Sequence, residues 1–128
     1  MDIEPISSTC VIVIETDGNI CYAHPADNTS AKAFINKLNS AELSIDLYDY
    51  NNSKKTGTLT FDLPQNTKLI ETNPGDIILC NGSISICLDK DTLNATPIAR
   101  IENTSKEKLL SVFGNGNIAV LFGLEWSE

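Results

Sequence analysis

The stretch NPGDIILCNGSISICLDK, residues 73–90, contains two short apolar runs separated by Asn81-Gly82. An Asn-Gly pair between two such runs is typical of a two-residue β-hairpin, because both turn residues must adopt positive φ. With this turn Cys80 faces Ser83, and alternate residues point to the same side of the hairpin. One side is apolar throughout: Ile77, Leu79, Ile84, Ile86 and Leu88. We therefore predict an antiparallel hairpin that presents this side to a hydrophobic core.

The two cysteines of this stretch, Cys80 and Cys87, lie on the opposite, less apolar side. Four strand residues separate them, about 13 Å at ~3.3 Å per residue, whereas the Cα atoms of a disulfide lie within about 7 Å. Cys10 and Cys21 are also too far apart in their own predicted hairpin. The chain has no C-x-x-C motif and one histidine, His24. We therefore interpret the cysteines as ordinary strand residues and expect no metal and no cofactor. One reactive thiol, Cys80 or Cys87, is the alternative.

Apolar and polar residues alternate along most of the chain, which is typical of short antiparallel strands. Beside the hairpin, we predict strands over residues 9–15, 20–23, 42–50, 56–64, 97–102 and 118–126. A helix is predicted over 29–38, where apolar residues recur at helical spacing. A second helix is predicted to begin at the capping box formed by Thr104 and Glu107 and to end at Gly114. Residues 65–75 are interpreted as a loop.

These elements amount to about eight strands and two helices. The chain has 128 residues, the length of one domain, and 41% of them are hydrophobic, which suffices for a core. We expect one all-β domain over residues 1–128, with residues 1–8 as a flexible N-terminal lead.

The charge of the chain limits its partners. Seventeen acidic against nine basic residues give a net charge of −8, which disfavours binding to nucleic acids and to anionic membranes. No apolar run approaches the roughly 20 residues that span a bilayer. The acidic N-terminal stretch lacks the basic region of a signal peptide. We expect a cytoplasmic protein without a nucleic-acid or membrane partner.

The best candidates for a binding site are aromatic and basic side chains on predicted outer surfaces. Tyr48 and Tyr50 share the outer side of one strand, where aromatic residues can form a binding platform. Lys54 and Lys55 follow in the next turn, and Arg100 is the single arginine. We predict that these five residues bind a small anionic molecule or an extended peptide. The alternatives are tyrosines packed beneath a loop or helix and an arginine that is only a surface residue. No residue is assigned a catalytic role.

The order of the motifs resembles that of the small cyclophilin-like proteins of bacteria and archaea. A helix that begins Thr29-Ser30-Ala31 is followed by the turn DYNNSKK, residues 49–55, and then by Leu63-Pro64. Pro74-Gly75-Asp76-Ile77 opens the hairpin, and Ala99-Arg100-Ile101 lies in a later strand. The resemblance covers about residues 9–126.

The resemblance implies a closed eight-stranded antiparallel β-barrel with two short capping helices, whose interior is filled by side chains. Any site would then lie on the outer surface or rim. Cyclophilins are prolyl isomerases that use an arginine in an apolar groove, but residues 56–64 contain no arginine. We therefore predict a binding module for a small molecule or an extended peptide, without isomerase activity. The alternatives are a prolyl isomerase with a rearranged site and a structural protein that forms a homodimer.

Overall fold

The computed structural model describes residues 9–127. The predicted flexible lead, residues 1–8, lies outside this range. Within it the chain forms these elements in order: β1 (Thr9–Thr16), β2 (Asn19–Pro25), α1 (Thr29–Ser40), β3 (Leu43–Tyr50), β4 (Lys54–Thr58), β5 (Lys68–Thr72), β6 (Asp76–Cys80), β7 (Ser83–Cys87), β8 (Asp91–Ile101), α2 (Lys106–Phe113) and β9 (Ile118–Ser127). Neither helix is long and apolar enough to cross a membrane.

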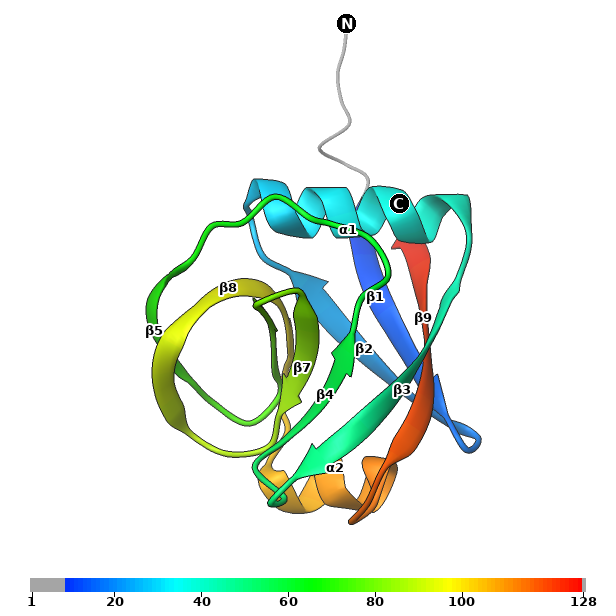
Figure 1. Ribbon diagram of the computed structural model, residues 1–128. Helices are drawn as coiled ribbons and strands as arrows, with labels where there is room; N and C mark the ends of the chain where they lie inside the picture. Colours follow the sequence, from blue (N-terminus) through cyan, green and yellow to red (C-terminus); the bar gives the residue numbers. More distant parts are fainter. Residues whose placement is uncertain (1–8, 128) are drawn as a thin grey trace, which may run out of the picture.

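Eight of these strands close into an antiparallel barrel, which confirms the predicted fold (Figure 1). The order around the ring is β2-β1-β9-β3-β4-β7-β6-β8. The ring closes where β2 pairs with the end of β8, with Ala23 opposite Ile101 and His24 opposite Arg100. The closed barrel was predicted from the family resemblance and not from the pattern of any single strand.

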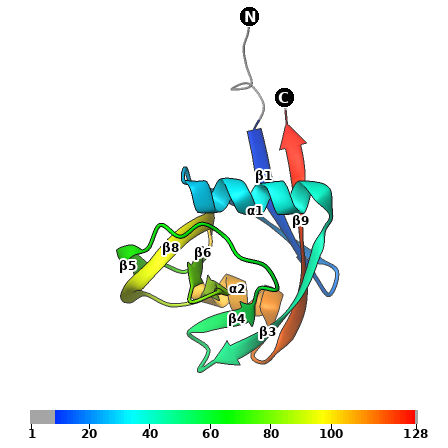
Figure 2. The same ribbon diagram turned by 45° about the horizontal axis from the view of Figure 1, so that its top comes forward.

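The two helices cover opposite ends of the barrel (Figures 1 and 2). The side chain of Asn28 caps α1 by accepting a hydrogen bond from the backbone N–H of Ala31 at 2.7 Å. Phe34 points from α1 into the core, where its ring meets Phe122 of β9 edge to face at a centroid distance of 5.7 Å. The predicted start of α2 was wrong by one residue, because Ser105 rather than Thr104 caps it.

The remaining strand, β5, lies outside the ring. Residues 65–75 were predicted as a loop, and this strand corrects that prediction. It pairs with the first half of β8, from Lys68 opposite Ala95 to Thr72 opposite Asp91. The second half of β8 pairs with β6. The first half of β8 therefore curves away from the barrel, and β5 runs alongside it (Figures 1 and 2). We call β5 and the first half of β8 the arc.

The arc covers the side of the β6–β7 hairpin that the sequence left as a less apolar outer face. The predicted register is correct, with Cys80 opposite Ser83 and Ile78 opposite Ser85. Beneath the arc, however, Ile78, Cys87 and Ala95 form a second small core, separate from the barrel interior. Cys87 is therefore buried, and both sides of the hairpin pack against protein.

The predicted strand over 56–64 was also displaced. The strand β4 ends at Thr58, and Leu59 and Leu63 reach the core from the loop that follows. At Gly57 the neighbouring strand β3 passes so closely that a Cβ atom would lie 2.7 Å from the carbonyl oxygen of Asp46. Because β4 begins at Lys54, both Lys54 and Lys55 lie in the strand, and their side chains point to opposite sides of the barrel wall.

Candidate functional site

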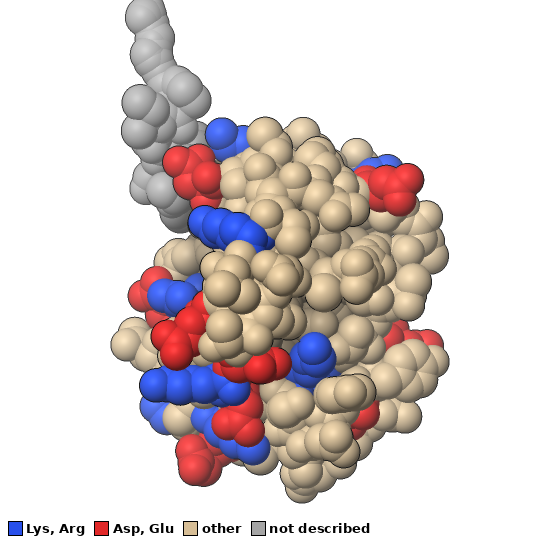
Figure 3. Space-filling model, turned by 60° about the vertical axis from the view of Figure 1, so that its left-hand side comes forward, with Lys and Arg blue, Asp and Glu red and all other residues tan. Residues whose placement is uncertain are grey.

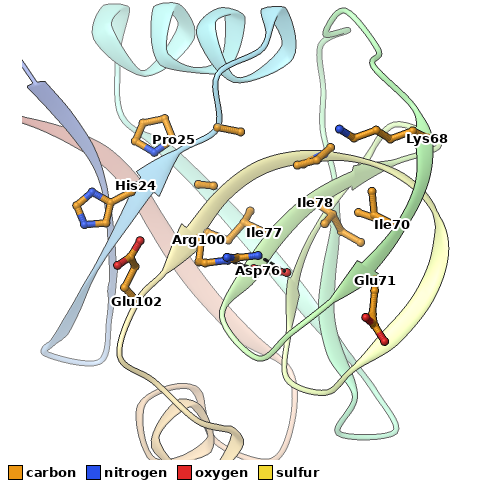
Figure 4. Close-up of a pocket in the computed structure, with 13 residues that line it drawn as sticks. His24, Pro25, Lys68, Ile70, Glu71, Asp76, Ile77, Ile78, Arg100 and Glu102 are labelled. Atoms are coloured by element: carbon orange, nitrogen blue, oxygen red, sulfur yellow. Dashed lines mark hydrogen bonds and ion pairs between the residues drawn. The ribbon is translucent and has the colours of Figure 1, made fainter.

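A cleft of about 390 Å³ opens on the outside of the barrel between the arc and β2. Its size lies in the range of small-ligand sites. The walls are mainly apolar and come from four strands: Pro25 of β2, Ile70 of β5, Ile78 of β6, and Pro97 and Ala99 of β8. Figure 4 shows these strands around the opening, with Ile70 and Ile78 on one side and Pro25 on the other.

An ion pair forms the floor of this cleft. The Nε of Arg100 lies 2.6 Å from Oδ1 of Asp76, and Nη2 lies 3.4 Å from Oδ2. The same carboxylate accepts a hydrogen bond from the backbone N–H of Asn73 at 2.9 Å. Asp76 and Arg100 sit opposite each other in the β6–β8 register, so two strands of the barrel hold the pair in place.

The guanidinium of Arg100 keeps donors available for a ligand. Of its five N–H groups, two contact Asp76, which leaves three without a partner among the described residues. The side chain is 58% exposed, whereas that of Asp76 is 12% exposed. The hydrogen bond that Arg100 donates to Asp76 raises the pKa of Arg100 above its usual value, so the group stays charged at all physiological pH values. The floor therefore offers a fixed, permanent cation.

The rim of the cleft carries charges of both signs. Lys68 and Glu71 come from β5, and Glu102 and His24 lie on the opposite side, as Figure 4 shows. Together with the Arg100–Asp76 pair, and leaving His24 aside, the lining has two basic side chains, Lys68 and Arg100, and three acidic ones. In Figure 3, acidic and basic side chains lie next to one another, mostly along the left-hand part of the view. Such a surface disfavours a polyanion and suits a ligand with one carboxylate or with charges of both signs.

The structure brings only some of the predicted site residues together. Tyr48 and Tyr50 project from the outer side of β3 and are 60% and 61% exposed. Lys54 pairs with Tyr50 across the β3–β4 ladder, and its Nζ lies 5.4 Å from the centre of that ring. Arg100, however, lies on β8, and strands β7 and β6 separate it from β4. The five residues do not form one site.

Lys55 occupies a different place from the one expected of a ligand-binding lysine. Its side chain is 0% exposed, and Nζ donates to Oδ1 of Asp49 at 3.0 Å and to the carbonyl oxygen of Gly116 at 2.6 Å. Adjacent residues in a strand point to opposite sides, so the outward position of Lys54 places Lys55 inside. The hydrogen bond from Lys55 is the main cause that lowers the pKa of Asp49.

The cysteines have no arrangement that suggests chemistry. All four are free thiols. Burial, as the main cause, raises the pKa of Cys87 to about 11, so its thiolate is scarce at neutral pH. Within residues 9–127, no three histidine, cysteine or acidic side chains gather as a metal site would require.

Several residues of the cleft were missed from the sequence. Asp76 was not predicted as a site residue, because its partner Arg100 is 24 positions away in the chain. Lys68, Ile70 and Glu71 belonged to the segment interpreted as a loop. The signal that could have found the cleft was Arg100 itself, the one predicted site residue that lies in it.

Comparisons with known proteins support the architecture. The model of the Cyclophilin-like family matches residues 14–123 of this chain. Among solved structures, the chain is similar to the solution structure of a hypothetical protein from Archaeoglobus fulgidus, with a TM-score of 0.62 and 11% sequence identity. The alignment covers 91% of this chain and 94% of that one. At this identity the likeness concerns the fold alone. No curated protein matches the sequence.

Proposed function

This chain belongs to the cyclophilin-like family, and we propose that it is a binding protein whose cleft holds a carboxylate-bearing small molecule or an extended peptide. One observation carries this proposal: Asp76 holds Arg100 in a cleft with mainly apolar walls, and three N–H groups of Arg100 have no partner among residues 9–127. Fold alone would not support it, because one fold serves many functions.

Preorganisation is the physical reason why this arginine suits a ligand. A free arginine loses rotamer entropy when a ligand fixes it, but Asp76 already holds the guanidinium of Arg100. Arginine binds carboxylates through parallel N–H donors, which are stronger than neutral hydrogen bonds. The apolar walls would exclude water from such a contact and strengthen it. The mixed charges of the rim favour one carboxylate over a more highly charged anion.

A thermal-shift screen with the full chain tests this proposal. The probes are N-acetylated amino acids, dicarboxylic acids and short peptides with a free carboxylate. A ligand at about a hundred times its Kd stabilises a protein by about 2.7 kcal/mol, a shift of several degrees. We expect Arg100→Gln to abolish the shift. Lys106→Gln is the matched control, since Lys106 forms an exposed ion pair with Asp89 at 2.8 Å. Shifts that survive Arg100→Gln would refute the assignment.

The outer side of β3 and β4 offers a second binding surface, made of Tyr48, Tyr50 and Lys54. The observation in its favour is the exposure of both tyrosine rings beside a lysine at cation–π distance. In the same screen, a ligand of this surface would lose its shift in Tyr48→Ala and keep it in Arg100→Gln. A proline-peptide isomerisation assay and light scattering separate the isomerase and homodimer alternatives from both surfaces.

A further inference from the structure

We infer that the ligand of the cleft is an extended peptide that pairs, as an additional strand, with the free edge of β5. This inference rests on the function proposed for the cleft. It adds a main-chain component to the ligand's recognition, so that the peptide's backbone, and not only its carboxylate, contributes to binding.

The first observation is that β5 is an edge strand. It stands at the end of the sheet order, and β8 is its one partner strand among residues 9–127. In an antiparallel pair, alternate residues direct their N–H and C=O groups away from the partner strand. Within the described part of the chain, no backbone group of residues 68–72 makes a backbone hydrogen bond beyond the β5–β8 ladder. One edge of β5 is therefore available to an incoming strand.

The second observation is that the cleft reaches the edge of this strand. Both Ile70 and Glu71 line the cleft, as does Lys68. Because adjacent strand residues point to opposite sides, a cleft lined by both Ile70 and Glu71 extends from the face that carries Lys68 and Ile70 to the edge of β5. Figure 4 shows the strand running along the opening, with Ile70 and Glu71 on it and Arg100 across from it.

The third observation is that the cleft supplies what an edge strand lacks, a determinant of specificity. Natural edge strands are protected from indiscriminate pairing when they are short and carry charged residues. The strand β5 is short and carries Lys68 and Glu71. A peptide that pairs here needs an additional contact, and Arg100 can provide it through a carboxylate. Ile70 and Pro97, which are both half-buried, provide an apolar surface for one side chain of the peptide. The occupant is thus an extended peptide with alternating apolar residues and a carboxylate.

The test uses a synthetic peptide, acetyl-Thr-Val-Thr-Val-Thr-Val with a free C-terminal carboxylate, and its C-terminal amide. Amide hydrogen exchange of β5 is followed by NMR on the full chain. We expect the carboxylate peptide to slow exchange of alternate β5 amides at least about tenfold, because only alternate residues face the free edge. Two peptides N-methylated at alternate residues separate the two sets of N–H groups. Methylation of the set that faces β5 should abolish binding, and methylation of the other set should leave binding intact.

The contribution of Arg100 is measured in the same titration. Replacing the carboxylate by an amide, or Arg100 by glutamine, should weaken binding about tenfold or more, as expected for the loss of a charge-assisted hydrogen bond. Lys106→Gln should leave the affinity unchanged. Because Arg100→Gln leaves Asp76 without its cation, Arg100→Lys serves as a second variant that retains the charge and loses the fork geometry.

Three results would overturn the inference in distinguishable ways. Binding that depends on Arg100 without any change in β5 exchange would refute strand pairing and retain the carboxylate cleft. No binding of either peptide at millimolar concentration would refute strand pairing too, since main-chain pairing tolerates many sequences. Protection of β5 amides that is present without peptide and decreases on dilution would show that a second copy of the chain covers this edge.

Discussion

Two ion pairs of this barrel join a cation on one strand to an aspartate on a neighbour, yet they differ in what they leave available. Lys55 and Asp49 meet inside one end of the barrel, where the lysine is fully buried and also donates to Gly116. Arg100 and Asp76 meet on the outside, where more than half of the arginine side chain is exposed. The lysine of the first pair is enclosed by the fold, whereas the arginine of the second pair faces a cleft.

The difference separates a structural pair from a binding site. Removal of the buried Lys55 side chain takes its hydrogen bonds from Asp49 and Gly116 and leaves a cavity, so its loss is costly. An exposed pair adds little stability by itself, and the spare N–H groups of Arg100 have no structural task among the described residues. We expect mutations of the two pairs to change different properties. Replacing Lys55 should mainly lower stability, and replacing Arg100 should mainly weaken ligand binding.

The largest effect should follow Lys55→Ala. We expect the free energy of unfolding to fall by about 3 kcal/mol, the order found when one partner of a buried pair is removed. Urea denaturation measures the change. Lys54→Ala is the matched control, because the adjacent lysine faces outward and should change stability by no more than about 0.5 kcal/mol. Equal losses in the two variants would contradict the assignment of Lys55 to the interior.

A smaller loss of stability is expected for Arg100→Gln. The exposed guanidinium contributes about 1 kcal/mol through its hydrogen bonds to Asp76. A double-mutant cycle with Asp76→Asn, followed by urea denaturation, isolates the coupling between the two side chains. A coupling as large as the effect of Lys55→Ala would mean that the Arg100–Asp76 pair is structural, which would remove the contrast between the two pairs.

The contrast between the pairs also shows what local sequence could predict. The β6–β7 hairpin was predicted in its correct register, because Asn81-Gly82 and the alternating apolar residues lie within one short segment. The interior position of Lys55 was not, because the run that follows it suggested a strand that began at residue 56. The true strand begins at Lys54, and its pairing with β7 places Lys55 opposite the core residue Ile86.

The cleft depends on contacts that no short segment contains. Arg100 was predicted as a site residue, but its partner Asp76 is defined only by the pairing of β6 with β8. The strand β5 has an exposed leucine at position 69 and only one half-buried apolar residue, Ile70, so its own pattern is weak. Its extended conformation comes from pairing with β8. A strand that is stabilised mainly by a distant partner cannot be recognised from alternation alone.

The pH dependence of stability should identify the enclosed pair. The hydrogen bond from Lys55 holds the pKa of Asp49 below its ordinary value in the folded protein. A group with a lowered folded pKa stabilises the protein above its unfolded pKa, about 3.9, and this stabilisation is lost as the pH falls through the folded pKa. We therefore expect wild type to exceed Asp49→Asn in stability at pH 7 and the gap to narrow below about pH 4. Urea midpoints at a series of pH values measure it, and a constant gap would contradict the pairing.

The smallest effect concerns the arc, and it appears as a rate rather than a change of stability. The arc covers Cys87, which is 3% exposed and whose pKa burial raises to about 11, whereas Cys80 of the same hairpin is partly exposed. At pH 8 only about a thousandth of the Cys87 thiol is ionised, and the reagent reaches it only when the arc opens. We expect a thiol reagent to label Cys80 well before Cys87 in the native protein, as followed by mass spectrometry of peptides.

The labelling rate of Cys87 also tests whether the proposed peptide binds beside the arc. A strand bound to the edge of β5 would stabilise the closed arc, so labelling of Cys87 should slow in its presence while that of Cys10, on β1, stays unchanged. Slowing of Cys10 and Cys87 together would indicate general stabilisation instead of a local effect. Native Cys87 that reacts as fast as Cys80 would show that the arc does not cover the hairpin in solution, and the cleft beside it would then lose one of its walls.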